Sequence, residues 1–514
     1  MSRIHATMAT AAVAVLALAG CAASGSDAGD SSATTDGGSG ITELRLGVTT
    51  QPATLDPAGG AWGARSAFYQ AAYDTLIRQT ADGELEPMIA SGWELSEDSL
   101  TLTLTIQDGI TFTDGTDLTS EDVVASLQRF KDGTSENAGD LADVSEITAI
   151  DDYTVELTLS APNPAILYML SRTAGLVASA DAIDEGVDLA TETVGSGPYI
   201  LDTAATVSGS SYVYTANPDY WAPELQNFET LVINVYDEQT AALNAIKGGD
   251  IDVARLTSNS NIPEIEASGW SVVGNELDVF GLQLYDRGGE MSEALGDVRV
   301  RQAINYAFDK EAMLQALESG YGTVTAQVFP STSEAFDPAL DEYYTYDPEK
   351  ALELMAEAGY ADGLELSMMS TALLPDALYT LIAQQLAEIG ITAVYTDPGA
   401  NLFADLLAPK FPAAYFGLER NTDWQLIQFA LAPTATFNPF HYEDPQVNEY
   451  IETIQYGDAE TQAATAAELN AYIVEQAWFA PFYTVQGSVA VSPDFTVDML
   501  VSNYLPAVYD IAAA

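Results

Sequence analysis

The position of the only cysteine, Cys21, constrains the fold most, because an apolar segment ends there and a polar one begins. An apolar run from Met8 to Ala19 follows Arg3 and His5, and this order is typical of a signal peptide. The run is shorter than the roughly 18 apolar residues that a membrane helix needs, and no later stretch reaches that length. We therefore expect residues 1–20 to be a signal peptide and the rest of the chain to be soluble.

The residues around Cys21 indicate an anchor. Leu18, Ala19, Gly20 and Cys21 resemble a bacterial lipobox, which implies cleavage before Cys21 and a lipid on its thiol, with a second acyl chain giving stable attachment to a membrane. An ordinary signal peptide with an incidental cysteine is the alternative. Residues 21–40, almost all Ala, Ser, Gly, Thr and Asp after the cysteine, predict a lipidated flexible tether.

Composition excludes several classes of function. The chain has 76 acidic residues against 16 lysines and arginines, a formal net charge of -60, which would repel nucleic acid. Such a surface is typical of adaptation to salt or alkali, and attraction of a cationic substrate is the alternative. Beyond the leader the only histidine is His441, so neither a Ser-His-Asp site with a spare histidine nor a Cys/His zinc cluster is easy to build. We expect no enzyme activity and no cofactor.

Local patterns predict an α/β protein with antiparallel additions. Thr and Leu alternate over residues 99–106, as in a half-buried strand, and 153–159 alternates in the same way. A helix is predicted to begin after Thr119, because Thr119 and Asp122 are three residues apart in the sequence, the spacing of a capping box. In the second half, a strand at 364–369, a helix at 376–389 and a strand at 391–395 form the unit of a parallel sheet with a crossover.

A series of short motifs in this order resembles one family. They are LDP at 55–57, GELEP at 83–87, SGWE at 91–94, IQDGITFTDGT at 106–116, LTSEDVVAS at 118–126, GSGPY at 195–199, NPDYW at 217–221, GDID at 249–252, VRVRQAI at 298–304, YDPEKA at 346–351 and AGY at 358–360. The chain resembles an extracellular solute-binding protein of family 5, the peptide/nickel class of ABC importer binding proteins. The resemblance covers about residues 44–500.

The resemblance implies a type II periplasmic-binding-protein-like clamp of two α/β lobes with an extra inserted domain. Lobe 1 would comprise residues 41–80, 195–285 and 485–514, the inserted domain 81–194, and lobe 2 residues 286–484. The implied function is that of a monomeric lipoprotein that captures an oligopeptide or similar small solute and delivers it to a permease and ATPase. There are two alternatives to this function. The same fold could bind an oligosaccharide or a metal chelate, or it could act as a ligand sensor instead of a transport receptor.

The resemblance also points to ligand-binding residues. In peptide-binding relatives, an acidic residue at the place of residues 417–424 pairs with the ligand amine, so Glu419 or Asp423 could serve here. The spacing of residues within 417–424 differs from that in the dipeptide receptors, which puts in doubt that the ligand is a peptide with a free amine. Arg420 could bind a ligand carboxylate or balance its acidic neighbours.

Aromatic side chains complete the candidate site. We expect cleft walls at Trp62, Trp424, Phe440 and Tyr483, although each could equally belong to a core. His441 suggests nickel only if a chelator supplies the other ligands, and an ordinary surface or core role is favoured.

Overall fold

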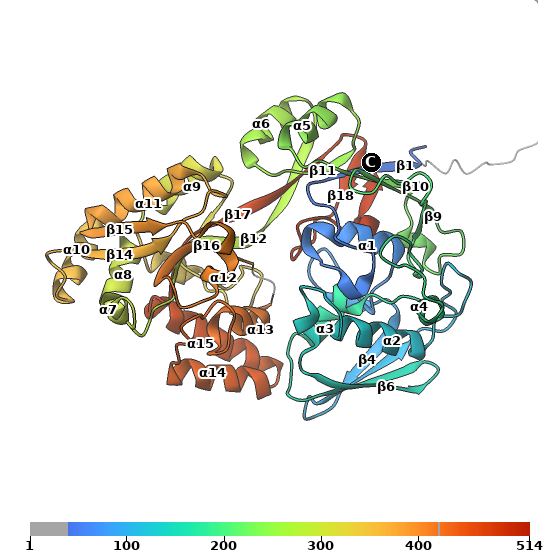
Figure 1. Cartoon of the computed structure of the whole chain (residues 1–514), viewed down its shortest axis with the longest axis horizontal. Coiled ribbons are helices and arrows are strands. Elements are labelled where there is room, and N and C mark those ends of the chain that lie inside the picture. Colours follow the sequence, from blue (N-terminus) through green and yellow to red (C-terminus); the bar gives the residue numbers. More distant parts are fainter. Residues whose placement is uncertain (1–39, 420–421) are drawn as a thin grey trace, which may run out of the picture. The chain divides into compact units, whose positions relative to one another are not determined.

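Two long antiparallel strands, β12 (Ser271–Leu284) and β17 (Phe479–Val491), run through the centre of the main sheet (Figure 1). The computed structural model describes residues 40–419 and 422–514, of which 41–514 form one compact unit. The predicted signal peptide, Cys21 and Arg420 therefore lie outside the described residues. Within the described part, no helix is both long and apolar enough to cross a membrane.

One end of this sheet of 11 strands belongs to lobe 1. The last residues of β17 pair with β11 (Val253–Arg255), and the sheet continues through β1 (Glu43–Val48), β10 (Thr230–Val235), β9 (Ser211–Ala216) and β8 (Tyr199–Leu201). Helix α1 (Ser66–Ala72) is buried in the apolar core on this part of the sheet.

The other end of the sheet belongs to lobe 2. Residues 278–284 of β12 pair with β16 (Ala413–Glu419), which is followed by β14 (Leu364–Met369) and β15 (Ile391–Thr396). Helix α11 (Asp376–Glu388) connects the parallel strands β14 and β15, which confirms the predicted strand–helix–strand unit. The remaining longer helices of lobe 2 are α8 (Val298–Tyr306), α9 (Lys310–Glu318), α10 (Pro348–Glu357), α14 (Pro445–Tyr456) and α15 (Ala459–Glu475).

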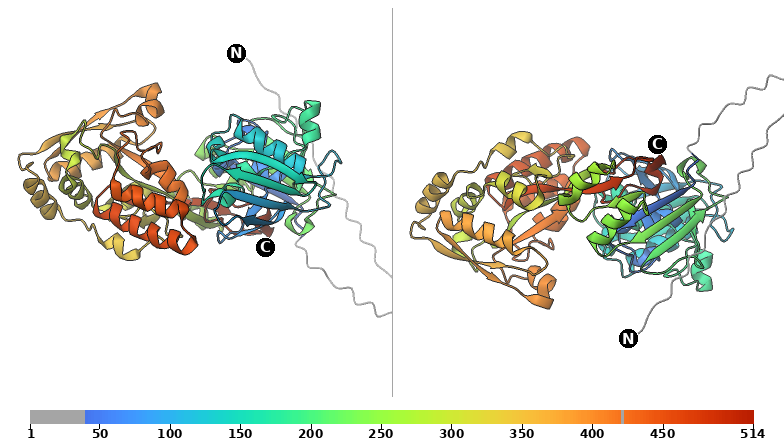
Figure 2. Two further views of the ribbon diagram at one scale, coloured as in Figure 1. Left: turned by 90° about the horizontal axis from the view of Figure 1, so that it is seen from below. Right: turned by 90° about the horizontal axis from the view of Figure 1, so that it is seen from above.

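A separate sheet of four strands forms the inserted domain, and the left view of Figure 2 shows it from below. Its order is β4 (Ala90–Leu95), β5 (Thr101–Ile106), β7 (Thr154–Leu159) and β6 (Val144–Asp151). Helix α2 (Ser120–Lys131) packs on it and begins with the predicted capping box, in which the Thr119 backbone N–H donates to Asp122 Oδ2 at 2.9 Å.

These pairings confirm the α/β class. Residues 278–284 of β12 pair with β16 and the last residues of β17 pair with β11, so the two long strands join the two ends of the main sheet. The residue ranges assigned to the lobes and to the inserted domain stay a proposal.

A buried carboxylate joins distant segments inside lobe 1. Asp74, which is 2% exposed, accepts hydrogen bonds from Ser196 at 3.0 Å, Tyr220 at 3.1 Å and Trp221 at 2.8 Å. Burial raises the pKa of Asp74 to about 7, although the three donors lower it. The GSGPY and NPDYW motifs thus have a structural role, because both supply partners for Asp74.

The raised pKa of Asp74 predicts a pH effect on stability. Because the folded-state pKa of about 7 lies above the ordinary value of 3.8, the protonated carboxyl stabilises the fold at acid pH. This contribution is lost as the pH rises through about 7. In urea unfolding, the wild type should therefore lose stability relative to Asp74→Asn between pH 5 and pH 8, by on the order of 2 kcal/mol. If the free energy of unfolding of the wild type and of Asp74→Asn depends equally on pH, the raised pKa of Asp74 is contradicted.

Candidate functional site

Three cavities meet around Tyr504, and together we call them the central cleft. The hinge cavity, of about 420 Å³, is lined by Arg255, Asp278 and Tyr483 among others. The large cavity, of about 690 Å³, includes Asp140 and Arg172 in its wall. The apolar cavity, of about 410 Å³, shares Glu419 with the large cavity and Asp278 with the hinge cavity, and Tyr504 lines all three. Volumes of roughly 300–1,000 Å³ are usual for small-molecule sites.

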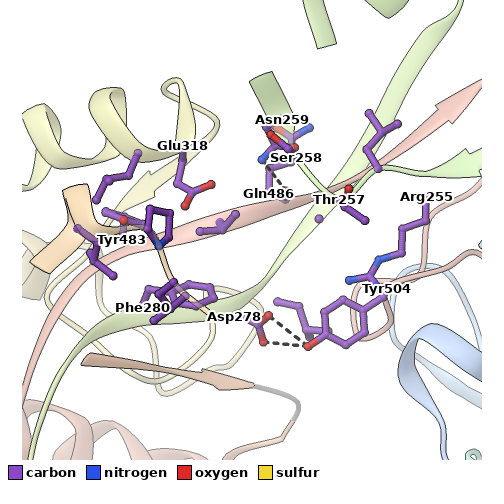
Figure 3. Close-up of a pocket in the computed structure, with 18 of the residues that line it drawn as sticks. Arg255, Thr257, Ser258, Asn259, Asp278, Phe280, Glu318, Tyr483, Gln486 and Tyr504 are labelled. Carbon is purple, nitrogen blue, oxygen red and sulfur yellow. Dashed lines mark hydrogen bonds between the residues drawn. The ribbon is translucent and has the colours of Figure 1, made fainter. Parts of the chain in front are cut away.

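A bulge in β12 positions the polar centre of the hinge cavity. The register of β12 against β17 shifts between Glu276 and Asp278 and again between Phe280 and Gly281, near the start of the β12 segment that pairs with β16. Tyr504 donates its hydroxyl hydrogen to the Asp278 carboxylate, with distances of 3.0 and 3.2 Å to the two oxygens (Figure 3). Burial and the Asp278 charge raise the pKa of Tyr504 well above its ordinary range, so the phenol remains a donor.

Arg255 is the unusual group of this cavity. Its guanidinium lies over the Tyr504 ring, 4.7 Å from the ring centre (Figure 3). No described residue forms an ion pair with it or accepts a side-chain hydrogen bond from it, although other described arginines, such as Arg45 and Arg78, have carboxylate partners. Burial lowers the pKa of Arg255, and the nearby Tyr504 and Asp278 oppose this effect. The donors of a half-buried cation thus face a cavity.

An ion pair and an unpaired acid face the large cavity. Arg172, only 8% exposed, lies 3.6 Å from Glu419 and donates to the Tyr168 hydroxyl at 2.6 Å. Asp140 has no side-chain hydrogen bond or ion pair with a described residue. Burial raises the pKa of Asp140 to about 6, while the Arg172 charge lowers it and the Glu419 charge raises it.

The structure brings some of the predicted site residues together. Trp62 and Glu419 both line the large cavity, and Tyr483 lines the hinge cavity. Trp62 and Tyr483 are also core residues, 8% and 0% exposed, so the cleft and core interpretations hold for the same side chains.

Other predicted residues lie elsewhere. Asp423 and Trp424 line a different cavity of about 300 Å³, which shares no lining residue with the central cleft. Ser333 donates to Asp423 there at 2.7 Å, and burial raises the pKa of Asp423. Phe440 packs against the core of lobe 2 and lines none of these cavities.

The histidine gives no metal site in the described part. His441 Nδ1 lies 3.0 Å from the Pro433 carbonyl oxygen, and the side chain is exposed. Among the described residues, no three His, Cys, Asp or Glu side chains are grouped so that they could hold a metal ion.

Sequence reasoning missed Arg255, Asp278, Tyr504, Asp140 and Arg172. The scarcity of cations was a usable signal, because each of the 16 lysines and arginines must serve some purpose in so acidic a chain. Arg255 also lies three residues after the GDID motif, at the end of the short strand β11.

The lack of a partner for Arg255 predicts that its removal does not destabilise the fold. Arg78 is a matched control, since it also lies over a tyrosine ring, at 4.8 Å from the centre, but pairs with Asp510 at 3.1 Å. We expect Arg255→Met to keep or raise the melting temperature and Arg78→Met to lower stability by about 1–3 kcal/mol. A similar loss in both variants would mean that Arg255 has a structural partner.

Comparison with known proteins agrees with this architecture. Residues 84–440 match the family model described as bacterial extracellular solute-binding proteins, family 5 Middle. The glutathione-binding protein GsiB of Escherichia coli (strain K12) is 26% identical over 438 residues, covering 80% of this chain and 82% of its own.

Two solved structures share the fold. DppA from Helicobacter pylori, in complex with the peptide STSA, has a TM-score of 0.75 and 20% identity, covering 92% of this chain and 98% of its own. HbpA2 from Haemophilus parasuis has a TM-score of 0.80 and 23% identity, covering 92% and 100%. Since the family model spans most of the chain, the protein belongs to the bacterial extracellular solute-binding proteins of family 5.

Proposed function

We propose that this solute-binding protein captures short peptides with free termini in the central cleft and delivers them to the permease and ATPase of an ABC importer. The observation that carries the proposal is Arg255, a half-buried cation that faces the hinge cavity without an acidic partner among the described residues. The proposed role is binding without chemical conversion of the ligand.

The carboxylate end of the ligand belongs at Arg255. A guanidinium presents a planar fork of donors that binds a carboxylate through two parallel hydrogen bonds. The net charge of -60 repels anions at long range, so an anionic group needs a specific cationic partner to enter the cleft. The Tyr504 ring beneath the guanidinium fixes its plane and leaves its donors for a ligand.

The ammonium end belongs at Asp140. In the large cavity, Arg172 and Glu419 already form a pair, whereas Asp140 has no donor among the described side chains. The hinge and large cavities meet at Tyr504, so an extended ligand could reach from Arg255 past Tyr504 to Asp140. Glu318, an acid in the hinge cavity itself, would suit only a shorter ligand.

The names of similar proteins support a peptide ligand. GsiB is named a glutathione-binding protein, and the DppA structure holds a peptide and is described as associated with an ABC transporter. Glutathione and STSA are both short, carry carboxylate groups and have a free amine.

Titration calorimetry with tetra-alanine, its C-terminal amide and its N-acetyl derivative tests the two anchors. Amidation should weaken binding to the wild type about 30-fold or more, because a charge-assisted hydrogen-bonded pair is lost. Arg255→Met should weaken tetra-alanine equally but leave the amide unaffected. Asp140→Asn should abolish the difference between tetra-alanine and its N-acetyl form.

Matched controls separate these effects from general damage. Arg299→Met and Asp181→Asn change residues outside the cleft and should bind like the wild type. If Glu318→Gln abolishes the acetyl effect and Asp140→Asn does not, the ammonium lies in the hinge cavity. If only cello- or xylo-oligosaccharides, or nickel with histidine, raise the melting temperature, the peptide proposal is wrong.

We also propose that the mature protein is a lipoprotein anchored through Cys21 to the outer side of the cell membrane. Cells fed an alkyne-labelled fatty acid should incorporate the label into the wild type, because the Cys21 thiol receives diacylglycerol. Cys21→Ser should carry no label and leave the membrane fraction. Secretion of wild-type protein without label would contradict the anchor.

A further inference from the structure

The apolar cavity of the central cleft is lined almost entirely by lobe 2. Its wall comes from the end of β14, the segment that follows it, α12 (Leu402–Leu406), β16 and the turn Ile427–Leu431. The charged residues of this cavity, Asp278 and Glu419, are both shared with a neighbouring cavity.

Several large apolar side chains of this wall are exposed. Leu373 is 76% exposed, Phe403 62% and Phe429 44%. Burial of a side chain such as phenylalanine or leucine is favourable by about 1.5–3 kcal/mol, so a wall that leaves them exposed gains when something apolar covers it. A grouping of such residues at a cavity indicates a binding site.

Aromatic packing gives the cavity a defined floor. The rings of Phe416 and Phe437 are stacked, with centres 5.1 Å apart, and Phe429 lies 4.8 Å from Phe437. Gly417, opposite Phe280 in the sheet, has no side chain, and a Cβ there would come within 2.6 Å of the Phe280 ring. Phe280 can therefore lie over the strand, where it lines both the apolar and the hinge cavity.

We infer that the apolar cavity accepts a large apolar side chain of the bound peptide and makes the protein selective for peptides with aromatic or branched aliphatic residues. This inference rests on the proposed peptide function. The inference is based on shared lining residues. Asp278, Glu419 and Tyr504 line the apolar cavity and also line the cavities proposed to hold the two charged ends of the peptide. A backbone held at those ends can direct a side chain over Phe403 and Leu373.

Calorimetry with the tetrapeptides Ala-Phe-Ala-Ala, Ala-Ala-Phe-Ala, Ala-Leu-Ala-Ala, Ala-Ser-Ala-Ala and tetra-alanine tests the inference. The wild type should bind at least one phenylalanine peptide about tenfold or more tightly than the serine peptide, as expected from burial of one aromatic side chain. Phe403→Ser should reduce this ratio several-fold and leave the affinity for tetra-alanine within about twofold. Phe403 is exposed enough for the variant to fold.

Tyr456→Ser is the matched control, since Tyr456 is 65% exposed and lies outside the central cleft. It should leave every affinity unchanged. Equal affinities of the wild type for all five peptides would overturn the selectivity and leave the peptide proposal standing. An equal loss for all peptides in Phe403→Ser would mean that the wall serves contact between the lobes. Failure of every peptide to bind the wild type would refute the proposed function itself.

Discussion

Backbone hydrogen bonds between β12 and β17 join the two ends of the main sheet, because β12 continues into its pairing with β16 and β17 into its pairing with β11. A bulge interrupts this ladder between Glu276 and Asp278, and bulges bend a strand and increase its twist. Asp278 follows this interruption and accepts a hydrogen bond from the Tyr504 hydroxyl. The central cleft thus lies beside the part of the ladder where the register shifts twice, between Glu276 and Asp278 and between Phe280 and Gly281.

Because the chain has few cationic side chains, the carboxylate partner of each arginine is informative about its role. In a chain with 76 acidic residues, carboxylate partners are abundant, and the described structure pairs Arg45 with Asp252, Arg129 with Asp56 and Arg172 with Glu419. Among the described residues, Arg287 and Arg301 also lack a carboxylate partner, but both are buried and line none of the three cavities, whereas Arg255 lines the hinge cavity. At long range the acidic surface repels anions, whereas the electrostatics inside the cleft depend on a few local groups that solvent screens less.

Local patterns were enough for the elements but not for the site. The alternation at 364–369 and 391–395 and the Thr119 capping box were readable, because the residues that decide them are neighbours in the sequence. Arg255, Asp278 and Tyr504 meet only through the sheet and the C-terminal segment, and no sequence spacing encodes that meeting. The resemblance pointed to residues 417–424, of which Glu419 lines the central cleft, whereas Asp423, the first residue of α13 (Asp423–Leu426), lines a different cavity.

The glycine at position 417 determines where the Phe280 ring can lie between two cavities of the central cleft. A Cβ at residue 417 would lie 2.6 Å from the ring of Phe280, which lines both the hinge cavity and the apolar cavity, so the position of this ring depends on the absence of one methyl group. A single codon change to alanine would displace the ring without touching any charged group. A substitution at this position could therefore change the ligand preference of a related receptor, while the strands and the charged side chains of the central cleft stay the same.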